Sequence, residues 1–144
     1  MKIADIPLPT IKVPDFGAVR DDEIETDHHD VPFGAYCWIY CTSAWPHRDP
    51  SWPDDLFLTL SIQSDHSVGD AKSDTDIYVG PGSLFIIDPL TTHWLRPHNP
   101  DVLWIGLQWE IEREAAKRKV RKIVERLGGQ WCLDRGRYRS WGPK

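Results

Sequence analysis

The chain has few cysteines and no long apolar run, and both absences narrow its class. Its three cysteines are Cys37, Cys41 and Cys132, an odd number in 144 residues. An odd count without a secretory signal favours reduced thiols over a disulfide framework. No segment approaches the roughly 20 consecutive apolar residues that a membrane-spanning helix needs, and residues 1–5 lack the apolar core of a signal peptide. We therefore expect a cytoplasmic protein that does not contact a membrane.

The charged residues are distributed unevenly along the chain. Residues 1–90 hold 16 acidic and 5 basic side chains, whereas residues 91–144 hold 6 acidic and 12 basic ones. The acidic part disfavours a nucleic-acid surface, and the basic part either meets an anion or balances the acidic part within one fold. We favour the balance, so a small-molecule or protein substrate is expected ahead of a nucleic acid. A homodimer stays open.

Length and turn residues indicate one β-rich domain. A chain of this size suits a single domain, and 8 tryptophans with 12 prolines favour strands joined by many turns. Residues 1–32 are predicted to form an extended acidic arm, with one short strand near residues 11–13. Residues 33–144 are predicted to form the domain.

Apolar runs within the domain predict short strands separated by Gly/Pro turns. The expected strands cover residues 33–43, 56–62, 77–79, 83–87, 92–95, 102–109 and 131–133. The polar segment 63–76 is predicted to be a long loop. Apolar residues then recur at helical spacing, which predicts a helix over about 110–127 that ends at Gly128-Gly129. This pattern predicts a mainly β sandwich or barrel with one C-terminal α-helix.

The segment Trp45-Pro46-His47-Arg48-Asp49-Pro50 offers a His-x-Asp, and a strand over residues 83–87 leads to a lone His93. Residues i and i+2 of a strand share a face, so His47 and Asp49 are expected to reach one ion from one strand. Two imidazoles and one carboxylate suit a mononuclear Fe(II) site with open positions. The alternative is a surface turn in which Asp49 caps a backbone amide.

At these residues the chain resembles the double-stranded β-helix (jelly-roll) superfamily, and within it the Fe(II)/2-oxoglutarate-dependent oxygenases. The likeness is carried by His47-Arg48-Asp49, the strand 56–62, the turn Gly80-Pro81-Gly82 with its following strand, and His93. Cupins share the fold and the Pro-x-Gly turn, but they usually carry His-x-His. The resemblance implies a double-stranded β-helix fold, with Fe(II) held by His47, Asp49 and His93.

The resemblance also implies that 2-oxoglutarate binds the metal and that a cation holds its far carboxylate. The family places this cation about ten residues after the distal histidine, where this chain has Leu103-Trp104-Ile105. Arg96 and Arg48 are the candidates to replace it.

The tryptophans at 45, 52 and 94 flank the proposed ligands. They are either packing residues or a substrate rim formed by Trp45, Trp52 and Trp94.

Three functions follow from this pattern. The first is a small non-haem Fe(II) oxygenase that uses 2-oxoglutarate for hydroxylation. The second is a non-catalytic binding protein on the same fold, of phage or accessory type. The third is a cupin-like metal enzyme without the keto acid. The missing cation favours the second and the third functions. The order His-x-Asp…His favours the first.

Overall fold

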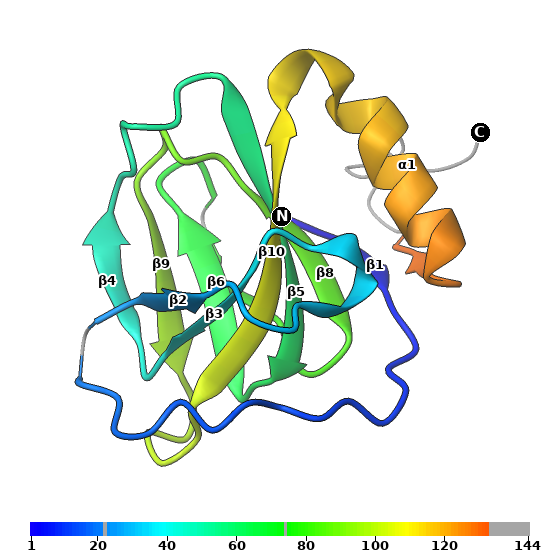
Figure 1. The fold of residues 1–144 in the computed structure, drawn as a ribbon. Coiled ribbons are helices and arrows are strands. Elements are labelled where there is room, and N and C mark those ends of the chain that lie inside the picture. The colour runs from blue at the N-terminus through cyan, green and yellow to red at the C-terminus, as the bar shows by residue number, and fades with distance from the viewer. Residues whose placement is uncertain (22, 74, 133–144) are drawn as a thin grey trace.

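Two antiparallel sheets make up the protein in the computed structural model, which describes residues 1–21, 23–73 and 75–132 (Figure 1). The larger sheet has seven strands, in the order β11 (Gln130–Trp131), β1 (Lys2–Asp5), β8 (Ser83–Ile87), β5 (Asp55–Gln63), β10 (Trp104–Glu112), β3 (Cys37–Cys41) and β2 (Glu25–Asp27). The smaller sheet has four, in the order β4 (Ala44–His47), β9 (His93–Pro97), β6 (His66–Asp70) and β7 (Ile77–Tyr78).

The eight strands from β3 to β10 give a jelly roll. Along the chain, strands β3, β5, β8 and β10 enter the large sheet, and strands β4, β6, β7 and β9 enter the small one. Each sheet therefore joins strands that are distant in sequence, which is the double Greek-key arrangement of jelly rolls. The predicted mainly β jelly roll with one C-terminal helix is confirmed.

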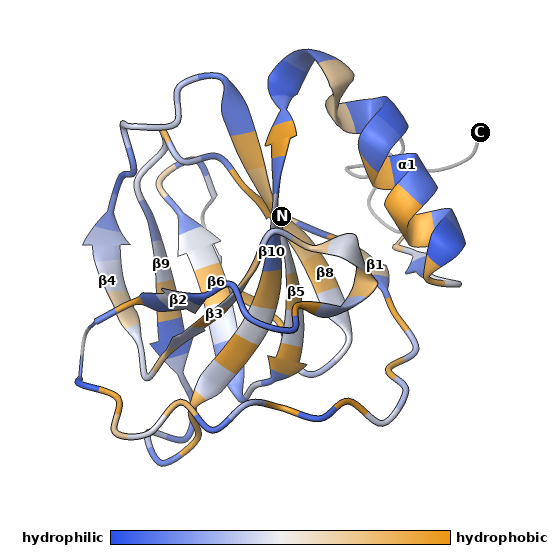
Figure 2. Cartoon of the chain, viewed as in Figure 1, coloured by the Kyte–Doolittle hydropathy of each residue, from blue (hydrophilic) through white to orange (hydrophobic). Residues whose placement is uncertain are grey.

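A large apolar layer covers the outer face of the seven-stranded sheet. Helix α1 (Ala116–Arg126) follows a 3₁₀ turn over Arg113–Ala115 and buries Ala116, Val120, Ile123 and Val124. These residues pack with the outward side chains of the sheet, among them Leu58, Leu107 and Ile111. Figure 2 shows the apolar stripe of α1 beside its charged surface. No helix of the described residues is long and apolar enough to span a membrane.

The inner face of the large sheet is turned toward the small sheet and is less completely filled. Alternate residues of each strand point inward, for example Phe57 and Thr59 on β5 and Gln108 and Glu110 on β10. A smaller apolar cluster occupies part of the space between the sheets, and it includes Phe85 and Trp104. The remaining space is the cavity described below.

The prediction of a long loop over residues 63–76 is wrong, because β6 lies within it. Its sequence His-Ser-Val-Gly-Asp has no apolar alternation, yet its first four residues are buried. Hydrogen bonds satisfy its polar groups: the His66 ring bonds Thr42, and the Ser67 hydroxyl contacts His98. Gly69 is needed where it stands, since a Cβ there would lie 2.4 Å from the Trp94 indole nitrogen.

Other element boundaries also differ from expectation. Residues 11–13 form no strand, whereas β1 and β2 of the expected arm pair with β8 and β3. Strand β4 includes Pro46, which the sheet tolerates because β4 is an edge strand. The helix begins at Ala116 and not near 110, because residues 110–112 continue the β10 ladder with β5. The expected strand at 131–133 appears as β11, and Leu133 lies outside the described residues.

His66 generates a testable prediction about stability. It is fully buried, its Nε2 donates to the Thr42 carbonyl, and its Nδ1 accepts the Asp65 amide proton. Replacement His66→Phe removes both bonds and should lower the free energy of unfolding by about 1–3 kcal/mol. Urea denaturation at pH 8 measures this loss, with the exposed His29→Phe as the matched control. Equal stability of the two variants would contradict the assignment.

The same residue predicts a pH dependence. Burial lowers the pKa of His66 below its ordinary value of 6.5, so the folded protein holds the ring neutral. The unfolded chain takes up the proton first as the pH falls through 6.5, and stability must fall with it. Denaturation at pH 8 and pH 5.5 should show a smaller pH-dependent loss in His66→Phe than in the parent protein. An identical loss would show that His66 is not the group responsible.

Candidate metal centre

The pairing of strands β4 and β9 brings His47 and His93 together. His47 ends β4, His93 begins β9, and the two residues are direct partners in the antiparallel ladder. Their rings meet edge to face, with centroids 4.3 Å apart and planes inclined at 60°. A register shift between Ala44 and His47 marks a bulge in β4, a feature that re-aims side chains at the edge of a sheet.

Asp49 reaches the histidines from a loop. Strand β4 ends at His47, so the expected placement of His47 and Asp49 on one strand is wrong. The Asp49 amide donates to the Pro89 carbonyl at 2.7 Å, which ties this loop to the segment that leads into β9. The carboxylate is thereby placed between the two imidazoles.

The three side chains converge at a spacing that suits one ion. Asp49 Oδ2 lies 3.2 Å from His93 Nε2 and 3.7 Å from His47 Nε2. All three candidate ligand atoms lie within 4.8 Å of one another. Ligands bound to one ion at about 2.1 Å, at right angles, lie roughly 3.0 Å apart. Small side-chain movements would close the remaining gap.

Backbone carbonyls fix the tautomer of both histidines. His47 Nδ1 lies 2.6 Å from the Trp45 carbonyl, and His93 Nδ1 lies 2.8 Å from the Thr91 carbonyl. A carbonyl only accepts, so each Nδ1 carries the proton and each neutral ring offers its lone pair at Nε2. The three atoms that face one another are then all acceptors. This arrangement calls for a cation or a proton between them.

The environment keeps Asp49 in its ionised form. Where a proton occupies this space, the hydrogen bond from His93 and the nearby charge of His47 lower the pKa of the Asp49 carboxyl, and they outweigh the burial that raises it. An ionised carboxylate beside two neutral imidazoles is the donor set of the 2-His-1-carboxylate triad, which is characteristic of Fe(II) sites.

Arg113 connects the loops that carry the ligands. Its guanidinium donates to both carboxylate oxygens of Asp88 and, through Nε, to the Pro53 carbonyl at 3.0 Å. Asp88 precedes the segment leading to His93, and Pro53 lies in the loop that follows Asp49. The bidentate contact lowers the pKa of Asp88 and raises that of Arg113. One arginine thus joins both sides of the triad to the end of β10.

A cavity of about 370 Å³ opens beside the triad, between the two sheets. His47, Asp49 and His93 all line it, and most of the remaining wall is apolar or aromatic. The lining residues identified in the described chain include no Lys and no Arg. Cys37 and Cys41 also line it as buried free thiols, in line with the expected reduced cysteines.

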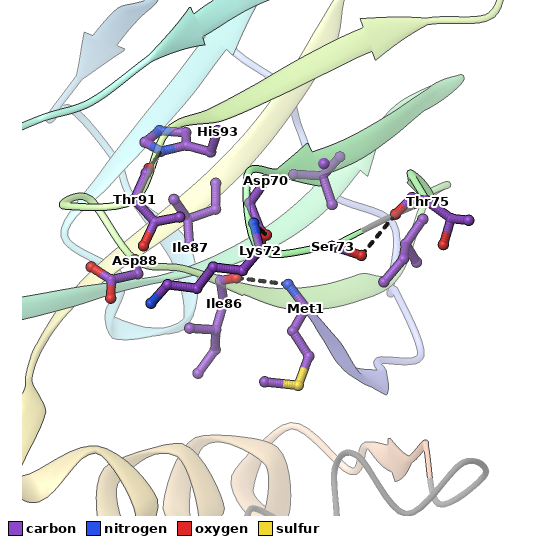
Figure 3. A pocket seen from close by; sticks show the side chains of 13 residues that line it. Met1, Asp70, Lys72, Ser73, Thr75, Ile86, Ile87, Asp88, Thr91 and His93 are labelled. Carbon is purple, nitrogen blue, oxygen red and sulfur yellow. Dashed lines mark hydrogen bonds between the residues drawn. The ribbon is translucent and has the colours of Figure 1, made fainter.

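His93 also borders a second, smaller cavity of about 200 Å³ (Figure 3). This cavity is lined by Lys72, Asp70, Asp88 and the hydroxyls of Ser73 and Thr91, among others. The terminal ammonium of Met1 donates to the Ile86 carbonyl beside it. His93 therefore borders both cavities.

The two arginines expected to bind a keto acid are exposed. Arg96 is largely exposed and pairs with Asp76 at 3.1 Å, and Arg48 is exposed in the loop after β4. Neither lines the cavity that contains the triad.

The tryptophans of the expected rim are placed differently from one another. Trp52 and Trp94 line the cavity, where Trp52 stacks edge-on against Phe57. The indole of Trp94 donates to Asp76 at 3.0 Å. Trp45 is 68% exposed and borders a separate shallow groove.

Sequence reasoning missed three cavity residues of interest, Glu110, Gln108 and Thr59. Gln108 and Glu110 stand at inward positions of β10, and Thr59 stands opposite Gln108 on β5. Their signal was present in the strand Trp-Ile-Gly-Leu-Gln-Trp-Glu, where polar residues fall on alternate positions of an otherwise apolar run. Buried polar side chains need hydrogen-bond partners, so polar residues on the buried face of a strand are candidates for contact with a ligand.

Comparison with known proteins gives likeness of structure only. No protein-family model matches the sequence, and no curated protein matches it.

Several solved structures are similar, among them the following three. A proposed mannose-6-phosphate isomerase from Ralstonia eutropha JMP134 has a TM-score of 0.47 and 10% identity, covering 71% of this chain and 99% of its own. KdgF from Halomonas sp. has a TM-score of 0.45 and 17% identity, covering 74% and 99%. The plu4264 protein from Photorhabdus luminescens has a TM-score of 0.44 and 17% identity, covering 84% and 99%. The jelly-roll assignment itself stands on the strand order of the two sheets.

Proposed function

We propose that this protein is a cupin-like, mononuclear Fe(II) enzyme that acts on a small organic molecule. The observation that carries the proposal is the convergence of three acceptor atoms, Asp49 Oδ2 and the Nε2 atoms of His47 and His93, beside a cavity. Buried or half-buried acceptors that face one another are repulsive unless a cation joins them. A divalent metal is the cation that this donor set suits best.

The chain's own residues would divide the work as follows. The carbonyls of Trp45 and Thr91 hold the imidazoles with Nε2 directed at the ion, as outer partners of metal-binding histidines usually do. The apolar wall limits the access of water, and it offers surface to an organic substrate. A bound Fe(II) would supply open coordination positions for oxygen or a substrate donor.

Dependence on 2-oxoglutarate is the second candidate. The order of ligands along the chain, His47-x-Asp49 followed by His93, favours it. The absence of Lys and Arg among the identified lining residues disfavours it, because the co-substrate would bring a second carboxylate without a cation to receive it. We therefore rank a cupin-like enzyme without the keto acid above the keto-acid oxygenase.

Metal binding is the first test. Anaerobic titration of the metal-free protein with Fe(II), measured by calorimetry, should show one binding site per chain. His47→Ala, His93→Ala and Asp49→Asn should each reduce the affinity by more than the 10–100-fold that loss of an outer partner costs. The affinity should also fall at acid pH, since both imidazoles must be neutral to bind. The control is His98→Ala, which alters a histidine outside the triad.

The same titration separates the candidates. A visible charge-transfer band that requires both Fe(II) and 2-oxoglutarate would identify the keto-acid oxygenase. One-site binding without that band supports the cupin-like enzyme. Failure of the parent protein to bind Fe(II), Mn(II), Co(II) or Zn(II) would contradict metal catalysis and leave a jelly-roll binding protein.

Arg113 provides a second prediction, on positioning. Arg113→Ala removes the bonds to Asp88 and Pro53 that join the ligand-bearing loops, so Fe(II) affinity should fall by about tenfold. The matched control is Arg126→Ala, which loses a comparable bond to the Phe33 carbonyl in another part of the molecule. Calorimetric titration of both variants gives the comparison. Equal Fe(II) affinities would show that the Arg113 contacts do not position the triad.

A further inference from the structure

The cavity beside the triad carries one ionisable carboxyl group that the metal would not use. Its acidic lining residues are Asp49, assigned to the metal, and Glu110, which projects from the inner face of β10. No Lys or Arg is among the identified lining residues that could neutralise Glu110. His28 also lines the cavity and interacts electrostatically with Glu110.

Glu110 stands in an environment that penalises its charge. Burial and the neighbouring Asp55 raise its pKa, and a hydrogen bond from Trp52 offsets only part of that effect. Burial and Glu110 together raise the pKa of the Cys37 thiol to about 11, so the thiol adds no charge to the cavity at neutral pH. A carboxylate in such surroundings gains most from a positively charged ligand.

Aromatic rings surround the same end of the cavity. Phe57 is the ladder partner of Glu110, and Trp52 lies edge-on to Phe57 with ring centroids 5.7 Å apart. Tyr36 and His28, edge-on at 5.1 Å, line the cavity as well. The faces of Trp, Tyr and Phe rings attract organic cations within about 6 Å of their centroids. A carboxylate with several aromatic rings is a typical recognition surface for an ammonium group.

A neighbouring polar group also lacks a partner. Thr59 is 2% exposed, lines the cavity, and its hydroxyl oxygen has no hydrogen-bond partner among the described residues. It stands directly opposite Gln108 in the ladder, one inward position along from the Phe57–Glu110 pair. A buried hydroxyl without a partner is costly, and a ligand that supplies a polar atom would remove that cost.

We propose that the cavity binds an organic cation, with its ammonium group at Glu110 and its apolar body against the inner wall toward Phe85. A polar atom of the ligand would meet Thr59 or Gln108. The substrate class implied is an amine or quaternary ammonium compound with an apolar or aromatic body. This inference rests on the proposed function only because both use the same cavity. The cation site can be tested without any metal.

Benzyltrimethylammonium is the probe for the test, because its quaternary nitrogen has no lone pair and cannot bind a metal. Its affinity for the chelator-treated protein is measured by calorimetry at pH 8, well above the ordinary pKa of a glutamate. We expect binding that weakens at least about tenfold in Glu110→Gln. Glu112→Gln, on the same strand but exposed, is the matched control and should bind as the parent does. Trp52→Leu should weaken binding several-fold.

Two further probes decide the class of ligand. 3-Phenylpropionate is an anion of similar size, and 3-phenylpropanol is a neutral molecule of similar size. Both should bind more weakly than the cation. Equal affinity of the cation for the parent and Glu110→Gln, tighter binding of the anion, or no binding of the cation would overturn the proposal. Cation binding in His93→Ala, a variant expected to bind no Fe(II), would support it. The proposed metal chemistry would then be judged by the Fe(II) titration alone.

Discussion

The ladder between β4 and β9 is the constraint on which the candidate site depends. It makes His47 and His93 direct neighbours although 46 positions separate them in sequence. Carbonyls two residues before each histidine then orient the rings, so the backbone of the same two segments sets both position and tautomer. Asp49 completes the set through its amide bond to Pro89, and Arg113 ties these loops to β10. The triad is therefore held by main-chain geometry more than by side-chain packing.

The fold separates the apolar layer that stabilises it from the cavity that can bind a ligand. Much of the apolar burial lies outside the jelly roll, between the large sheet and helix α1, with residues such as Leu107 and Val124 fully buried. This outer layer lets the space between the sheets hold polar residues and remain partly open. The inner positions of β5 and β10 can then carry Thr59, Gln108 and Glu110, which a fully packed core would exclude.

Much of the fold could be predicted because apolar runs identify central strands. The predicted strands 33–43, 56–62, 83–87 and 102–109 overlap β3, β5, β8 and β10, and the spacing of Val120, Ile123 and Val124 indicated the helix. Strand β6 could not be predicted, because its polar residues are satisfied by distant partners such as Thr42 and His98. The triad was predicted from residue types, but Glu110 was not, since its inward direction depends on the register with Phe57.

The central claim is that one metal ion binds between His47, Asp49 and His93. X-ray absorption at the iron edge of the anaerobically loaded protein tests it most directly, because the spectrum reports the atoms bound to the ion. We predict a shell of nitrogen and oxygen at about 2.0–2.2 Å, with the outer scattering of two imidazole rings. The free thiols of Cys37 and Cys41 line the same cavity and are the competing ligands. Sulfur at about 2.3 Å, or the absence of imidazole scattering, would contradict the account.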